Sequence, residues 1–171
     1  MTTEPLGEPA RALRDPQAIV EGQLDHHRDA LLRKLDALSA AGRTRSLVPS
    51  GWTPLGLLKH LTYVERRWLQ WGFRAEPVTD PWGDVHPETD VWTVSEDESY
   101  EVLRRRFEDQ AVRSREIVAS ASLDDVAALG GRFDEDPPTL AWILLHLVQE
   151  YARHVGHLDI VVELARGDVG E

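Results

Sequence analysis

The stretch from Asp136 to Gly167 constrains the fold of this chain more than any other segment, because it reads as one long amphipathic helix. Asp136 can cap the first free N–H groups of such a helix, and Pro137 suits its first position. Gly167 is a typical residue for a helix end. Apolar residues recur between these limits at helical spacing, so we expect one face of the helix to be buried.

Four polar side chains share the predicted buried face of this helix: His146, Glu150, His154 and His157. On a helical wheel of about 100° per residue, the three histidines fall within about 40° of Glu150. Burying such groups without partners would cost on the order of several kcal/mol each. Two explanations fit this pattern, a bound metal ion or a hydrogen-bonded polar network.

Three further segments also show apolar residues at helical spacing. One begins at Asp15-Pro16 and extends to about Gly42, and a second covers residues 54–73 after a Thr-Pro start. A third follows the capping box Ser95-x-x-Glu98 and extends to about residue 121. No segment alternates as a strand would, so the predicted fold is an all-α four-helix bundle with a long connection, residues 74–94, between helices two and three.

The domain organisation predicted from these segments is simple. Residues 1–14 carry no helical pattern, and we expect them to form a flexible N-terminal arm. Residues 15–171 have the length of one bundle domain with a real core. Within it, residues 123–129 are expected to form a short turn of helix that ends at Gly130-Gly131.

Composition excludes several function classes. The chain has no cysteine, which excludes disulfides, thiolate metal sites and a cysteine nucleophile. A net charge of −11 argues against a nucleic-acid partner and an anionic membrane surface. Neither a signal-peptide pattern nor an apolar run of membrane-spanning length is present. We therefore expect a cytoplasmic protein.

The polar residues of the last helix favour a metal site. Glu150 and His154 are four residues apart on one helix face, so both side chains can bind a single ion. His60, at the edge of the apolar stripe of the second helix, is the best third ligand, although a lone histidine there is also typical of a hydrogen-bonded core residue. Two histidines and a glutamate suit zinc, nickel or another first-row divalent ion, with one position left open. His157 and His146 are alternative ligands, or groups that orient the ligands.

Two segments resemble the DinB-like superfamily. Residues 51–61, GWTPLGLLKHL, resemble its second helix, and residues 139–160, TLAWILLHLVQEYARHVGHLDI, resemble its fourth. The similarity is greatest to an actinobacterial branch sometimes called mini-circle proteins. The superfamily also includes bacillithiol S-transferases and mycothiol-dependent maleylpyruvate isomerase.

The resemblance implies a metal-ligand set of His60, Glu150 and His154. Many members carry histidine where this chain has Glu150, and the isomerase branch carries glutamate there. His157 stands where many members have a glutamine, which favours a role in orienting the ligands over direct binding of the ion.

The resemblance also implies an activity, the transfer or addition of a low-molecular-weight thiol such as mycothiol to a small electrophile. The connection 74–94, with Trp82, His86 and Trp92, would then help to cover the electrophile. The alternative is a non-catalytic, metal-binding stress-response bundle, and metal-assisted hydrolysis is a third possibility. A homodimer is compatible with the first two functions.

Overall fold

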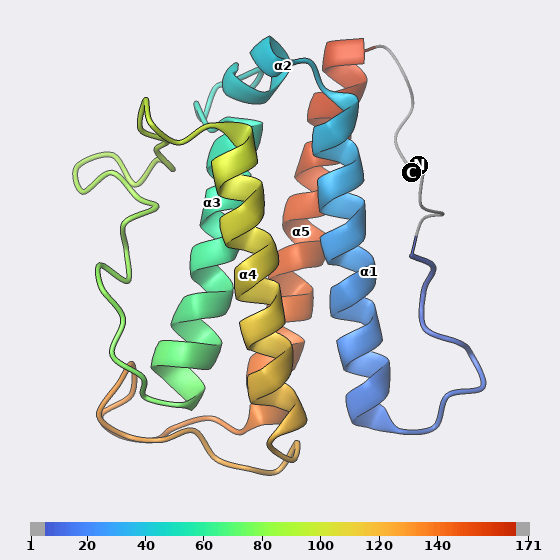
Figure 1. Ribbon diagram of the computed structural model, residues 1–171, viewed down its shortest axis with the longest axis vertical. Coiled ribbons are helices and arrows are strands. Elements are labelled where there is room, and N and C mark those ends of the chain that lie inside the picture. The colour runs from blue at the N-terminus through green and yellow to red at the C-terminus, as the bar shows by residue number, and fades with distance from the viewer. Residues whose placement is uncertain (1–5, 167–171) are drawn as a thin grey trace.

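Four long helices stand side by side in the computed structural model, which describes residues 6–166, without the side chain of the last (Figure 1). The helices are α1 (Pro16–Ala37), α2 (Ala40–Thr44), α3 (Pro54–Glu65), its π-helical continuation η1 (Arg66–Phe73), α4 (Tyr100–Ala119) and α5 (Leu140–Arg166). Between residues 6 and 166 the only β structure is two isolated bridges. The prediction of an all-α bundle is confirmed, and the longest connection joins η1 to α4 along the outside of α3.

Two of the predicted helix starts are confirmed by their caps. The Asp15 carboxylate accepts a hydrogen bond from the Gln17 N–H at 3.1 Å, directly before Pro16. The Thr53 hydroxyl accepts one from the Gly56 N–H at 3.0 Å, directly before Pro54. Each cap satisfies an N–H group that lacks a partner within its own helix.

The prediction that the first helix continues to about Gly42 is wrong. Helix α1 ends at Ala37, Leu38 is extended, and Ser39 caps the separate helix α2 by accepting a hydrogen bond from the Gly42 N–H. The serine cap starts a new helix here, since its side chain satisfies the N–H groups that a continuous helix would have bonded internally.

The starts of the last two long helices also differ from prediction. The Ser95 N–H donates to Glu98 at 3.0 Å as in a capping box, yet α4 begins only at Tyr100 after the cap Ser99. The Glu98 carboxylate also accepts a hydrogen bond from Lys59, at 2.7 Å. Helix α5 begins at Leu140, because residues 126 and 139 form a β-bridge that keeps the preceding backbone extended.

The segment between α4 and α5 contains no helical turn at residues 123–129, contrary to prediction. The Ala127 N–H donates to Pro138 and the Ala128 N–H donates to Phe73, so tertiary contacts use the groups that a helix would pair internally. Asp136 has a positive φ of 47° and does not cap α5. The predicted helix end at Gly167 lies outside the described residues.

The core is built from the inner faces of all four long helices. Leucines dominate it, including Leu31, Leu35, Leu57, Leu58, Leu61, Leu144, Leu147 and Leu158, all fully buried. Burying one such side chain contributes about 1.5–3 kcal/mol. Helix α5 packs mainly against α1, and α3 packs against α4. This packing holds α3 and α5 as fixed supports for the side chains between them.

None of the helices within residues 6–166 combines the length and the apolar character needed to cross a bilayer.

Candidate metal centre

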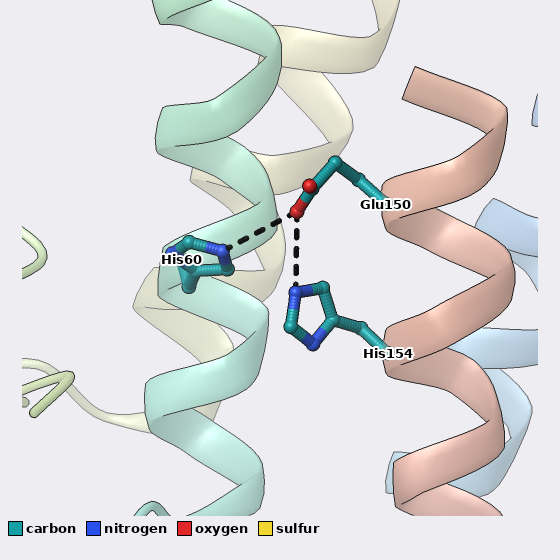
Figure 2. A group of neighbouring side chains, drawn as sticks. All are labelled: His60, Glu150 and His154. Atoms are coloured by element: carbon teal, nitrogen blue, oxygen red, sulfur yellow. Dashed lines mark ion pairs between the residues drawn. The ribbon is translucent and has the colours of Figure 1, made fainter. Parts of the chain in front are cut away.

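Three metal-competent side chains converge between α3 and α5 (Figure 2). His60 projects from α3, while Glu150 and His154 project from successive turns of α5. The Glu150 Oε2 atom lies 3.2 Å from His154 Nε2 and 4.0 Å from His60 Nε2. One donor atom from each of the three residues lies within 4.8 Å of the other two. Their sequence spacing therefore brings together an N₂O donor set.

The His60 ring is held in place by a buried carboxylate. Asp84 Oδ2 lies 2.9 Å from His60 Nδ1, and Asp84 is itself bound by Arg67 at 2.6 Å. A carboxylate at Nδ1 fixes the proton there and leaves Nε2 free to bind a cation. The sequence reasoning missed Asp84, whose only signal was its place in the unusually long connection 74–94.

Trp92 covers one side of the site. Its ring stacks on His60 with 4.1 Å between centroids and an interplanar angle of 19°, and it meets His154 edge-on at 5.1 Å. Of the other two residues expected to cover the site, Trp82 lies over the Arg67 guanidinium. His86 is exposed, and its Nδ1 accepts a hydrogen bond from the Glu88 N–H. The connection thus reaches the donor atoms through Trp92.

His146 and His157 flank the cluster but do not join the group of three. His146 Nε2 lies 3.8 Å from the second Glu150 oxygen, Oε1. The exposed His157 ring is 5.6 Å from the His154 ring. These positions fit the role of orienting or shielding the central residues.

The site electrostatics favour the protonation states that metal ligands require. Burial lowers the pKa of His60, although the hydrogen bond with Asp84 acts in the opposite direction. The hydrogen bond from His154 lowers the pKa of Glu150. A neutral imidazole and an ionised carboxylate are both ready to bind a cation near pH 7. The buried His154 Nδ1 has no hydrogen-bond partner among the described residues. The cluster is therefore compatible with a bound divalent ion.

Comparison with known proteins identifies the family. A sequence model described as mycothiol-S-transferase matches residues 19–167. The chain belongs to the mycothiol S-transferase family. The match confirms the resemblance to DinB-like proteins drawn from residues 51–61 and 139–160. No curated protein matches this family member.

A solved structure supports the fold of this mycothiol S-transferase family member. The crystal structure of a conserved protein from Enterococcus faecalis aligns with a TM-score of 0.67 over 91% of this chain and 100% of that chain. Sequence identity is 15%, so this likeness concerns the fold alone.

Proposed function

We propose that this protein is a divalent-metal-dependent S-transferase that joins a mycothiol-type thiol to a small electrophile. The observation that carries the proposal is the convergence of His60, Glu150 and His154, with donor atoms within 4.8 Å of one another, in a member of the mycothiol S-transferase family. The proposed ligand set is these three residues, and zinc or nickel suits its mixed nitrogen and oxygen donors.

The chain's own residues have distinct tasks in this proposal. His60 and His154 each present a ring nitrogen to the space between α3 and α5. Asp84 holds the His60 ring through its contact with Nδ1. Glu150 supplies one negative charge, which offsets half the charge of a divalent ion. Such an ion, when bound, supplies positive charge that favours the thiolate form of the thiol.

The sulfur must come from a cosubstrate, because the chain has no cysteine. In an addition reaction, the sulfur bonds to one carbon of an activated double bond and the thiol proton ends on the other. In a displacement, the leaving group departs with its electron pair and the proton goes to solvent. Trp92 supports this chemistry by excluding water from the His60 side of the site.

The first test measures metal content and thiol transfer together. Zinc- or nickel-loaded wild type should bind about one metal ion per chain by elemental analysis, as a three-ligand site requires. His154→Ala should lose most of that metal because a three-ligand site becomes a two-ligand site. His157→Ala is the matched control, since it removes a histidine from the same helix that lies outside the donor group, and it should keep its metal.

Mass spectrometry should then show adducts between mycothiol and a generic electrophile with wild type and His157→Ala, and background rates with His154→Ala. Equal metal content in wild type and His154→Ala would refute the ligand assignment. Metal binding with background rates for wild type across several thiols would favour the non-catalytic, metal-binding bundle.

A further inference from the structure

Arg132 is a half-buried cation without a counter-charge in the part of the chain that the structure describes. It lies in the segment between α4 and α5, and its guanidinium makes no hydrogen bond or ion pair within residues 6–166. The chain has 30 acidic residues and 19 lysines and arginines, so carboxylates are not scarce. Burial, reinforced by the nearby charge of Arg67, lowers the pKa of Arg132. A charge removed from water and left unpaired is costly, so this guanidinium is suited to binding an anionic group.

Tryptophan rings surround this guanidinium. Its central carbon lies 4.2 Å from the centroid of the Trp68 ring, 5.4 Å from that of Trp82 and 6.0 Å from that of Trp71. Cation–π contacts of this kind hold the planar group against a ring and leave its N–H donors available. Trp82 is 51% exposed, so solutes can reach the cluster.

The backbone fixes Arg132 firmly beside these rings. The Arg132 N–H donates to the Trp71 carbonyl at 3.0 Å, and the Ala128 N–H donates to Phe73 at 2.9 Å. The chain approaches η1 so closely that a Cβ at Gly131 would lie 2.1 Å from the Trp71 carbonyl oxygen. These contacts fix the backbone of Arg132, and the Trp68 ring restrains its guanidinium, before any ligand arrives, which reduces the entropy lost on binding.

The same cluster borders the candidate metal centre. The Trp68 ring lies 4.4 Å from the His146 ring, and His146 Nε2 lies 3.8 Å from Glu150 Oε1. Trp68 and His146 thus connect Arg132, through successive contacts, to the carboxylate of Glu150 in the proposed ligand set. Trp142 stacks on His146 with an interplanar angle of 7° and is itself 51% exposed.

We propose that Arg132, Trp68 and Trp82 bind a planar, aromatic or conjugated carboxylate, and that the small electrophile of the proposed transferase belongs to this class. A guanidinium can donate two parallel N–H bonds to one carboxylate. Adjacent indole rings can stack on the planar remainder of the molecule. The assignment of this ligand as electrophile rests on the proposed function, whereas the binding site itself does not.

Binding of sodium benzoate, followed by tryptophan fluorescence at constant ionic strength, tests this inference on the full-length, metal-loaded protein. Benzyl alcohol is a neutral probe of similar size that keeps the phenyl ring. Benzoate should bind more tightly than benzyl alcohol, and Arg132→Gln should weaken benzoate binding about tenfold or more while leaving benzyl alcohol unchanged. The benzoate affinity of Arg132→Lys should fall between those of wild type and Arg132→Gln, because lysine keeps the charge and loses the bidentate geometry.

Arg105→Gln is the matched control, since it removes an exposed arginine from α4 and changes the net charge equally. It should bind benzoate as wild type does. Equal benzoate affinity in wild type and Arg132→Gln, with unchanged thermal melting, would refute the inference, and so would equal binding of the two probes to wild type.

The His154→Ala variant separates this inference from the proposed function. Benzoate binding that survives in this variant supports a site at Arg132. Loss of benzoate binding in His154→Ala with retention in Arg132→Gln would assign the carboxylate to the metal position and overturn the inference. Absent thiol transfer beside intact Arg132-dependent binding would refute only the proposed function.

Discussion

Asp84 shows how a single residue outside the ligand set can control it. Its buried carboxylate joins His60 Nδ1 to the Arg67 guanidinium, so the His60 ring cannot rotate away from α5 without breaking its contact with a carboxylate that Arg67 holds in place. A histidine with this support presents its second nitrogen in one orientation. The orientation of a proposed ligand on α3 therefore depends on a residue in the connection that follows η1.

Replacing Asp84 by alanine should lower metal affinity about 10- to 100-fold, the usual effect of removing a carboxylate behind a ligating histidine. Competition between the protein and a chelating dye for zinc measures this affinity directly. Glu88→Ala is the control, because it removes an exposed carboxylate from the same connection. Unchanged zinc affinity in a folded Asp84→Ala protein would contradict the support role.

At this scale the sequence allowed some contacts to be predicted and not others. Glu150 and His154 lie four apart on one helix, so their proximity follows from helix geometry. The approach of His60 follows from its place on a core-facing edge together with the family resemblance. Asp84 and Arg132 lie in irregular segments, where no period relates sequence position to direction.

At the scale of elements, the junction of η1 with the segment before α5 organises the aromatic side of the site. Helix η1 carries Arg67, Trp68 and Trp71, and the π-helical winding changes which of its residues face a given side. Gly131 lets the facing segment approach this helix, because any side chain there would meet the Trp71 carbonyl.

Gly131→Ala should therefore destabilise the fold by about 1–3 kcal/mol, as expected for forcing an extra methyl group into a packed contact. It should also weaken benzoate binding, since Arg132 would move with the segment. Gly156→Ala provides the same substitution at a helical position with open space. It should raise stability by about 0.5–1 kcal/mol. Chemical unfolding of both variants checks the pair, and equal stabilities would contradict a close contact at Gly131.

Helix boundaries were predictable where a local cap had no competitor. Asp15 and Thr53 each precede a proline and cap as expected. Asp136 precedes a proline too, but the bridge between residues 126 and 139 holds the chain extended until Leu140. The bridge between residues 126 and 139 therefore decided where α5 begins, and the local Asp-Pro pair did not. Sequence spacing alone does not predict such a bridge.

At the scale of the whole molecule, a charged network lies in the centre of the bundle. Arg28 of α1 donates to both oxygens of Glu65 on α3, at 2.8 and 2.9 Å, and the Tyr151 hydroxyl of α5 donates to the same carboxylate. Glu65 has no exposed surface. These bonds connect α1, α3 and α5, and a hydrogen bond from Ser114 of α4 to the same carboxylate brings in the fourth long helix. The network therefore fixes the relative register of the helices that carry the candidate metal centre.

The protonation state of Glu65 links this network to stability. Burial alone would raise the pKa of Glu65, but the charge and hydrogen bonds of Arg28, with bonds from Ser114 and Tyr151, hold it below the ordinary value of 4.5. The unfolded chain therefore binds this proton at a higher pH than the folded protein does. The stabilisation is fully present above about pH 4.5 and is lost as the pH falls through the lower, folded-state pKa.

Replacing Glu65 by glutamine should accordingly change both the free energy of unfolding at neutral pH and its dependence on pH. At pH 7 the variant should lose about 3–5 kcal/mol, because the buried Arg28 loses the Glu65 carboxylate and keeps only the partly exposed Asp25 as a counter-charge. Below pH 4.5 the wild type should lose stability more steeply than the variant, whose residue 65 cannot titrate. Denaturant unfolding between pH 7 and pH 3.5 measures both quantities. Glu96→Gln, which removes an exposed carboxylate, should follow the wild-type curve. A Glu65→Gln curve parallel to wild type throughout would show that the network does not set acid stability.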